Sequence, residues 1–319
     1  MHEDRTAGPV AFPPALTSQG LTSRALTMAD AEAVFEVMVA QERCDLGFAE
    51  IELADIVGDW QRPSWDVKAH TVGVFDGALL VAYAEVGTAD RGDAAVHPRY
   101  RGRGVGTWLA HWMQGRARAL GRPLIGMAVP EGSPGDRLLT GLGYHVRWTS
   151  WVLKLPQGAE IVPRALPHGY AVRAADPGEY PAVHDVVEDA FLEWSDRDRE
   201  TYDDFAAVTF QRPGFEPWHI RVVADADGVV VGAAFVSVYD AEDGRGAEAY
   251  ISRLAVRADQ RGRGLAQALM VDAFALAREH GAVSSSLSTD SRTGALGLYE
   301  KVGMQVDSVW VHRAITLAG

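Results

Sequence analysis

A glycine- and arginine-rich stretch occurs twice in this chain, and the repetition limits what the chain can fold into. Residues 101–106 have the sequence RGRGVG, and residues 261–266, 160 positions later, have the sequence RGRGLA. The same offset carries other residues of the first copy onto identical residues of the second: Leu109 onto Leu269, Ala117 onto Ala277, Gly121 onto Gly281 and Gly143 onto Gly303. A match over more than forty residues with no net insertion indicates two similar domains in one chain.

Each stretch lies between a predicted strand and a predicted helix. In the second copy an apolar run ends at Val256, and the helix pattern that begins at Leu265 continues in steps of three and four residues to a stop at Gly281. The first N–H groups of a helix have no intrahelical partner, and the helix dipole places positive charge behind them. Glycines let a large anion approach the backbone, and Arg261 and Arg263 are expected to add donors. The pattern therefore predicts a diphosphate site.

The stretch resembles the acetyl-CoA pyrophosphate loop of the GCN5-related N-acetyltransferases, which has the pattern [RQ]xxGx[GA]. Arg261, Gly264 and Ala266 match it. The likeness covers residues 22–155 and 168–317, and the tandem arrangement resembles that of the mycothiol synthases. It implies an α/β (α+β) protein with two tandem domains of this family, each a mixed, mostly antiparallel sheet with helices on both faces.

Four segments follow from this comparison and from the composition. Residues 1–21, rich in Pro, Gly and small polar residues, are expected to be disordered, and residues 156–168, with three prolines and no periodicity, form a linker. The two domains then span 22–155 and 169–319, the first non-catalytic and the second catalytic. The hairpin turns at Asp76-Gly77 and Asp227-Gly228 are 151 positions apart, so the second copy gains nine residues before its glycine loop.

The resemblance assigns acetyl-CoA as co-substrate and implies which residues bind it. In the family the pantetheine lies along the strand that precedes the loop, and one N–H there polarises the thioester carbonyl. The implied cofactor-binding residues are Leu254, Ala255, Val256, Arg261, Gly262, Arg263, Gly264, Leu265, Ala266 and Ser291 in the second copy, and Val96, Arg101, Gly102, Arg103, Gly104, Val105 and Gly106 in the first. The family often has Asn where Ser291 stands, which weakens that contact. The first domain is expected to hold CoA or acetyl-CoA without turning it over.

The candidate catalytic residues are Tyr299 and Glu248. Residues 293–304 resemble the family element whose tyrosine faces the CoA sulfur, so Tyr299 is the candidate acid for the departing thiolate. The first copy has Leu139 at this position, which cannot move a proton. Glu248, eight residues before Val256, is the candidate base for the amine.

Several alternatives remain for the base and for the acceptor pocket. Tyr250 aligns with the family's base position nearly as well as Glu248, and Glu193 and Asp240 are further candidates. An aromatic cluster is expected to lie mostly in the core, with the remainder lining an acceptor pocket: Phe191, Trp194, Tyr202, Phe205, Phe210 and Phe215.

Composition narrows the function classes. With 47% hydrophobic and 23% charged residues, the chain has the composition of a soluble globular protein, and it has no apolar run long enough to span a membrane and no secretory signal. A single cysteine fits a cytoplasmic location. The net charge of −13 argues against a nucleic-acid partner and so against an RNA-binding RG protein. The scattered histidines predict no metal.

The sequence thus predicts an N-acetyltransferase that acts on an amine of a small molecule or peptide by direct attack, as a monomer or homodimer. The alternative is a non-catalytic acyl-CoA-binding sensor or scaffold. The acceptor stays open among polyamines, aminoglycosides, aminosugar-cysteine compounds and peptide N-termini.

Overall fold

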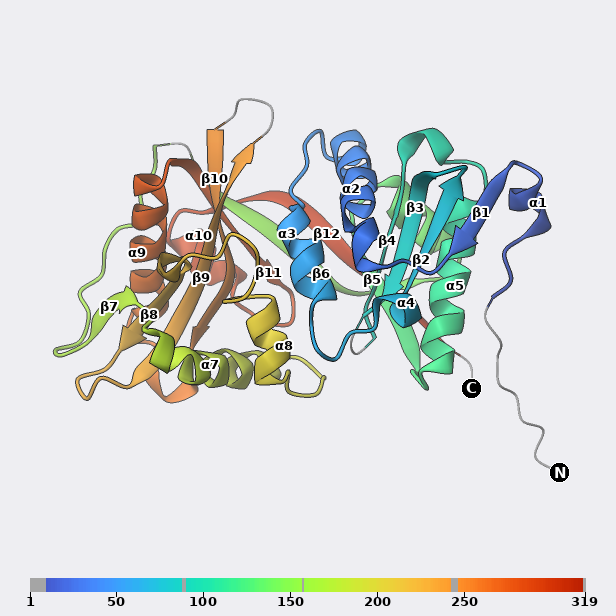
Figure 1. Ribbon diagram of the computed structural model, residues 1–319. Coiled ribbons are helices and arrows are strands. Elements are labelled where there is room, and N and C mark those ends of the chain that lie inside the picture. The colour runs from blue at the N-terminus through green and yellow to red at the C-terminus, as the bar shows by residue number, and fades with distance from the viewer. Residues whose placement is uncertain (1–9, 88–89, 157, 242–245, 318–319) are drawn as a thin grey trace. The chain divides into compact units, whose positions relative to one another are not determined.

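The computed structural model describes residues 10–87, 90–156, 158–241 and 246–317, although the side chains of residues 240 and 241 are left out. The chain divides into two compact units, one formed by residues 1–149 with 310–319 and the other by residues 150–309. Figure 1 shows the elements of each unit, coloured along the chain.

The first unit contains an antiparallel sheet in the order β1-β2-β3-β4. These strands are β1 (Leu21–Arg24), β2 (Thr71–Asp76), β3 (Leu79–Val86) and β4 (Gly92–Val96), and the unit also contains β5 (Leu124–Pro130), which is not part of this four-stranded sheet. A parallel bridge between Arg91 and Gly126 joins the start of β4 to β5. Residues Trp310–Thr316 of β12 (Gln305–Thr316) pair with β5 antiparallel.

Helices cover both faces of this sheet. Alternating strand residues pack on one face against α5 (Val105–Ala119) and on the other against α2 (Ala31–Asp45) and α3 (Leu53–Trp60). The smaller elements are α1 (Pro14–Thr17), η1 (Met28–Asp30), α4 (Val67–His70), η2 (Pro98–Tyr100) and α6 (Pro134–Gly141).

The second unit repeats this plan with longer strands. Its strands are β7 (Ala171–Ala174), β8 (Ile220–Ala224), β9 (Val230–Ala241), β10 (Gly246–Val256), β11 (Ala282–Asp290) and residues 150–155 of β6 (His145–Leu155). Neighbouring strands are antiparallel except β10 and β11, which are parallel. The predicted mixed, mostly antiparallel sheets are confirmed.

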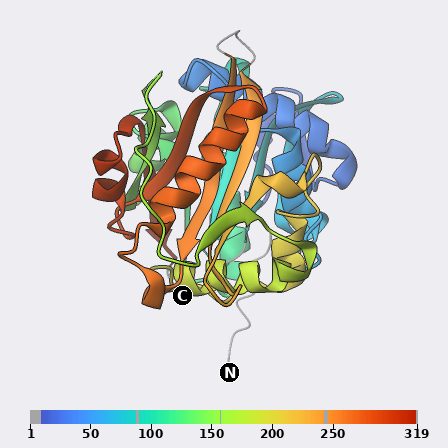
Figure 2. The same ribbon diagram turned by 90° about the vertical axis from the view of Figure 1, so that its left-hand side faces the viewer.

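Two helical layers cover the sheet of the second unit. The helix α9 (Leu265–Glu279) packs on one face, as Figure 2 shows, and α7 (Tyr180–Leu192) and α8 (Tyr202–Ala207) pack on the other. The remaining elements are η3 (Pro177–Glu179), η4 (Pro217–His219), η5 (Ala258–Gln260) and α10 (Leu296–Lys301).

The compact units differ from the predicted domains because the two copies exchange their closing strands. Residues 150–155 belong to the first copy by sequence, yet they pair with Ser285–Asp290 of β11 inside the second unit. The corresponding strand of the second copy, Trp310–Thr316, pairs with β5 inside the first unit. The internal offset of 160 could not reveal this exchange. The offset shows which residues of the two copies correspond, but two closing strands of similar apolar pattern can pair with either sheet.

The two segments expected to lack structure are ordered where the structure describes them. The prediction of disorder is wrong for residues 10–20, because Leu16 of α1 is 2% exposed in the core of the first unit. Residues 1–9 lie outside the described part. The linker has no helix or strand in residues 156 and 158–168, but Ile161 is 5% exposed in the core of the second unit.

The nine extra residues of the second copy lengthen the β9–β10 hairpin. The strands β9 and β10 have 12 and 11 residues, whereas β3 and β4 have eight and five. The tip of the hairpin, residues 242–245, lies outside the described residues. The insertion therefore extends the strand that carries the candidate base.

Candidate active site

The second glycine loop, residues 261–266, has the predicted geometry. It joins η5 to α9, and Gly262 and Gly264 have φ angles of +76° and +82°. Gly264 is the N-cap of α9. Among the described residues none accepts a hydrogen bond from the backbone N–H groups of residues 262–264. These groups, together with the first turn of α9, are available to an anion.

The first motif arginine, Arg261, has partners within its own unit, and its predicted contact with the diphosphate stays a prediction. Arg261 forms a two-pronged ion pair with Glu193, at 2.6 and 2.7 Å, and its Nε donates to the carbonyl of Val256 at 3.1 Å. The side-chain hydrogen bond from Arg261 lowers the pKa of Glu193, which fits a permanently ionised partner and not a base. Arg261 therefore fixes the loop to the end of α7.

The first glycine loop, residues 101–106, contains the same clamp. Arg101 pairs with Asp45, at the end of α2, at 2.7 and 2.8 Å. Gly102 and Gly104 have φ angles of +75° and +91°. Both loops thus share a backbone geometry and an arginine held by an acid at the C-terminal end of a helix, α2 in the first unit and α7 in the second.

The strand β10 diverges from its parallel neighbour before it reaches the loop. Pairing with β11 ends at Ile251, while pairing with β9 continues to Val256 after a bulge. The side of residues 254–256 that faces away from β9 is left without a strand partner. An extended ligand can hydrogen-bond to this open backbone edge as an added strand would.

The N–H group of Val256 points into this opening. Arg257 N–H donates to Val231 of β9 at 2.9 Å, so by strand alternation the N–H groups of Val256 and Leu254 face away from β9. In the part of the chain that the structure describes, no acceptor binds the N–H of Val256.

The corresponding N–H in the first unit is occupied. His97 N–H donates to Val81 at 2.9 Å, so Val96 N–H also points into its opening, but there it donates to Gln41 Oε1 at 2.9 Å. In this structure the N–H group expected to contact the cofactor at Val96 is bound to a side chain of α2. This is the first chemical difference between the two copies.

Tyr299 lies on α10 and packs in the core of the second unit. Its side chain is 8% exposed, and within the described residues its hydroxyl has no hydrogen-bond partner. Burial raises the pKa of Tyr299 to about 12, so the hydroxyl keeps its proton at neutral pH and is able to donate a hydrogen bond to an anion. The counterpart in the first unit, Leu139, is a buried core residue.

Glu248 is engaged by neighbouring side chains. Its carboxylate accepts from Ser286 Oγ and pairs with Lys154 Nζ at 3.2 Å. It precedes Leu254 by six residues, about 20 Å along a strand. A base must lie within hydrogen-bond reach of the attacking amine, or one water away. This distance does not support a role for Glu248 in taking the proton directly from an amine that attacks a thioester carbonyl bound at the N–H group of Leu254.

The other predicted polar residues have the following positions. Tyr250 lies on the same face as Glu248, nearer to Leu254, and its hydroxyl contacts Ser288 Oγ at 2.7 Å. Ser291 is exposed in the turn between β11 and α10. The side chain of Asp240 lies outside the described residues.

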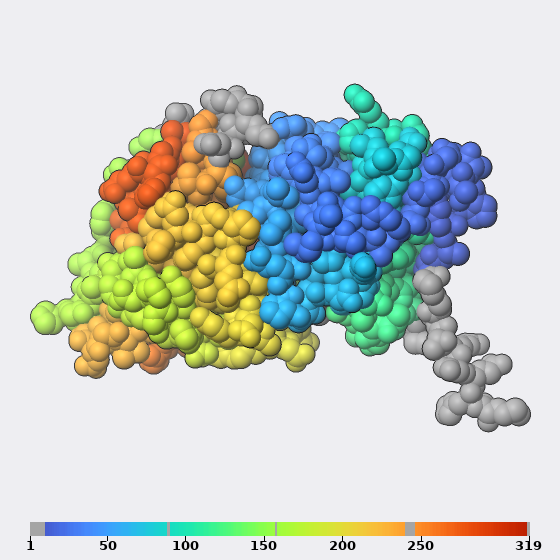
Figure 3. All heavy atoms as spheres, in the orientation of Figure 1, coloured from blue at the N-terminus to red at the C-terminus, as the bar shows by residue number. Residues whose placement is uncertain are grey.

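The face of β10 opposite α9 is covered by aromatic residues. Phe205 is fully buried, and Phe191, Phe210 and Phe215 pack around it, as expected for a core cluster. Figure 3 shows the atoms of α7, α8 and their connecting segment packed against one another at the surface of this unit. The ring of Trp194 instead lies under the guanidinium of Arg292, whose Cζ atom is 4.8 Å from the ring centroid.

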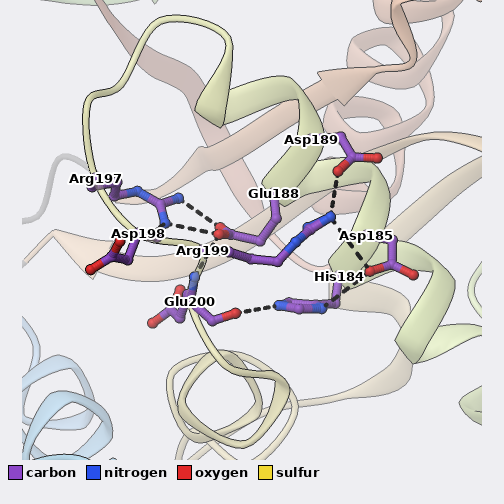
Figure 4. A network of polar contacts seen from close by, with 8 residues as sticks. All are labelled: His184, Asp185, Glu188, Asp189, Arg197, Asp198, Arg199 and Glu200. Atoms are coloured by element: carbon purple, nitrogen blue, oxygen red, sulfur yellow. Dashed lines mark hydrogen bonds and ion pairs between the residues drawn. The ribbon is translucent and has the colours of Figure 1, made fainter.

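A polar network that the sequence did not reveal fastens the connection between α7 and α8. Buried Glu188 accepts two hydrogen bonds from Arg197, at 2.8 and 2.7 Å, and one from Glu200 N–H at 2.8 Å (Figure 4). Burial alone would raise the pKa of Glu188, but these hydrogen bonds and the charge of Arg197 lower it. His184 contacts the Glu200 carbonyl at 2.9 Å. The network fixes the segment that covers the sheet.

In the first unit the equivalent face carries a buried acidic cluster. Glu85 and Asp93 are directly opposite each other on β3 and β4, where the second unit has Phe235 and Arg253. Trp60 Nε1 donates to Glu85 at 2.9 Å, and the Tyr83 hydroxyl donates to Asp93 at 3.0 Å. Burial and the nearby Asp93 raise the pKa of Glu85 to about 8. Trp60 of α3 and its partners therefore occupy this face.

Comparisons with known proteins agree with this geometry. The sequence model of the "Acetyltransferase (GNAT) family" matches residues 180–304. A mycothiol acetyltransferase of Salinispora arenicola is 30% identical, covering 73% of this chain and 76% of that protein. Another, from Thermobispora bispora, is 28% identical over 72% of this chain and 78% of its own length.

A solved structure extends the likeness over the whole chain. The crystal structure of a GCN5-related N-acetyltransferase from Sphaerobacter thermophilus has a TM-score of 0.70 and 25% identity, covering 97% of this chain and 98% of that one. The chain belongs to the tandem GCN5-related N-acetyltransferase family. It is an acetyl-CoA-dependent N-acetyltransferase.

Two further observations concern the described residues alone. None of their helices has the length and apolar character needed to cross a membrane. They also contain no group of three or more His, Cys, Asp or Glu side chains placed to hold a metal ion.

Proposed function

We propose that acetyl transfer takes place in the second unit and that the first unit has no catalytic turnover. The difference between the two strand openings is the main support: Val256 N–H has no partner in the described chain, whereas Val96 N–H is bound by Gln41. Tyr299 occupies a buried position that is Leu139 in the first copy, and this second difference adds to the support. This asymmetry favours the enzyme over a non-catalytic sensor or scaffold.

The proposed roles follow from the available hydrogen-bond donors. The N–H groups of residues 262–266 bind the diphosphate of acetyl-CoA, which supplies the acetyl group as an activated thioester. The N–H groups of Val256 and Leu254 bind the pantetheine arm and the thioester oxygen, where negative charge develops as the amine attacks. Tyr299 donates a hydrogen bond to the sulfur as its bond to carbon breaks.

The acceptor amine is proposed to enter from the face of β10 that carries Tyr250 and Glu248. A free amine has a pKa of roughly 10 and must lose a proton before it attacks. Glu248 lies too far along the strand to remove this proton directly. The net charge of −13 favours the approach of a cationic amine, and the proton leaves to water.

The acceptor is proposed to be a small-molecule amine of the mycothiol class. The support is the name of the relatives, mycothiol acetyltransferase, at 28–30% identity. Polyamines, aminoglycosides and peptide N-termini are the competing acceptors.

The acceptor is tested by offering the protein acetyl-CoA with each amine of such a panel and measuring the release of the CoA thiol. The site assignment is tested with Gly264→Val and its matched control Gly104→Val, since both glycines have positive φ and cap their helices. Gly264→Val is expected to abolish turnover and acetyl-CoA binding to the second unit, and Gly104→Val is expected to retain both. The reverse pattern, in folded variants, would place the chemistry in the first unit.

A further inference from the structure

Arg164 lies against the second glycine loop although it is about one hundred residues away in sequence. A Cβ atom built on Gly264 would lie 2.7 Å from Arg164 Cδ and 3.1 Å from its Nε. The stem of Arg164 thus passes directly over the glycine that caps α9. Neither the motif nor the predicted linker pointed to this residue.

The segment before β7 is held in this position at both ends. The carbonyl of Val162 accepts from Gln267 Nε2 at 2.6 Å, and Leu166 packs with Leu265 and Leu269 of α9. Figure 2 shows this segment, in green, running beside α9. Because residues 162 and 166 are fixed to the helix, Arg164 is placed at its N-terminus.

Farther along, the segment is tied to the loop by Tyr170. Its hydroxyl donates to Gln260 at 2.8 Å and accepts from Arg263 Nη1 at 3.1 Å. The Tyr170 hydroxyl therefore orients Arg263 but, being uncharged, does not neutralise it.

Among the described residues, two guanidinium groups at the loop have no acidic partner, those of Arg263 and Arg164. Arg261 is neutralised by Glu193, and Arg257 by Asp259. Arg164 is exposed, and among the described residues it has no acidic partner. An unpaired guanidinium beside free backbone N–H groups at a helix N-terminus is the arrangement that binds a phosphate.

In the described residues before β1, which begin at residue 10, no cation takes the place of Arg164. There the segment before β1 places Leu16 Cδ2 4.0 Å from a Cβ built on Gly104, and Gln19 Nε2 approaches the carbonyl of Arg103 at 3.5 Å. The two copies therefore pass the same part of the chain over the same glycine, with an apolar side chain in one and a guanidinium in the other.

We infer that Arg164 is a ligand of the CoA diphosphate in the second unit, supplied by the segment between the two domains. This inference rests on the proposed function, since it adds a residue to the same site. The absence of such a cation at Leu16 makes the first loop a weaker site for the same diphosphate.

The test measures the Kd values of CoA and of 3′-dephospho-CoA by calorimetry for the full chain and for Arg164→Gln. Loss of one charge-assisted contact is expected to weaken both ligands by about 10- to 100-fold. Arg164→Lys, which keeps the charge but loses the planar fork, is expected to recover part of the loss. Equal weakening of the two ligands identifies the diphosphate, which both contain.

Arg278→Gln is the matched control. It removes the same charge from the other end of α9, fourteen residues or about 21 Å from Gly264, and is expected to leave both Kd values unchanged. Unchanged or tighter binding in Arg164→Gln would overturn the inference, as would a loss confined to CoA, which would indicate the 3′-phosphate. If the wild-type chain binds neither ligand, the proposed function itself fails.

Discussion

Replacing Tyr299 by Phe removes one oxygen and leaves the ring in place. The ring packs in the core of the second unit, and the hydroxyl has no partner among the described residues, so the variant should fold with nearly unchanged stability. Any effect on turnover then reports on what the hydroxyl does in the reaction.

The size of the effect follows from the raised pKa of Tyr299. A thiol has a pKa of about 8.5, so a phenol with a pKa of about 12 would give up its proton to a thiolate at a cost of about 5 kcal/mol. Full proton transfer is therefore unfavourable, and the hydroxyl acts as a hydrogen-bond donor to the developing thiolate. A hydrogen bond to a charged group contributes about 1.5–3 kcal/mol, which corresponds to roughly 10- to 150-fold in rate.

The assay measures kcat from thiol release, the Kd of acetyl-CoA by calorimetry and the melting temperature. We expect kcat to fall within this range while Kd and melting temperature change little. A kcat equal to that of the wild type would refute the role of Tyr299. A loss near 10⁴-fold would refute the argument from its pKa and indicate full proton transfer.

Three further results are expected. Glu193→Gln should raise the KM for acetyl-CoA several-fold with little change in melting temperature, because it releases the partly exposed Arg261 from its clamp; an unchanged KM would make the pair incidental. Glu85 keeps its proton in the folded state up to about pH 8 but loses it near pH 4.5 in the unfolded state. The folded protein therefore loses stability as the pH rises from about 4.5 to about 8, and Glu85→Gln should flatten the pH dependence of the melting temperature. An equally steep decline in the variant would contradict that assignment. Calorimetry should show one tight acetyl-CoA site per chain. Gln41→Ala, which frees the Val96 N–H group, should strengthen binding at a second site in the first unit. Two equal sites in the wild type would contradict the asymmetry between the units.

The fold class and the backbone of the site could be predicted from the sequence because they depend on local patterns. The glycines at positive φ, the helix that begins at Leu265 and the hairpin turns are each set by a few neighbouring residues. The repeat then carried the same prediction to the first copy. The internal offset also located the insertion that lengthens β9 and β10.

The partners of the site residues could not be predicted, because they come from distant parts of the chain. The pair between Arg261 and Glu193 joins residues 68 positions apart, and Arg101 and Asp45 are 56 apart. A motif shows that an arginine is present, but an acid elsewhere decides whether its charge is free. Arg164 was missed for the same reason, since only the path of the chain over α9 places it at the loop.

The exchange of closing strands gives the first copy a structural role that does not depend on turnover. Residues 150–155, which end the first copy, pair with β11 in the second unit, and β11 leads directly to the turn before Tyr299. The first copy in turn receives Trp310–Thr316 as the partner of β5. Loss of the first copy would leave the backbone groups of Ser285–Asp290 exposed along an unpaired strand edge, which costs stability and invites aggregation. Under the proposed function, the first copy can therefore have Leu139 in place of the catalytic tyrosine while its closing strand remains necessary for the sheet of the second unit.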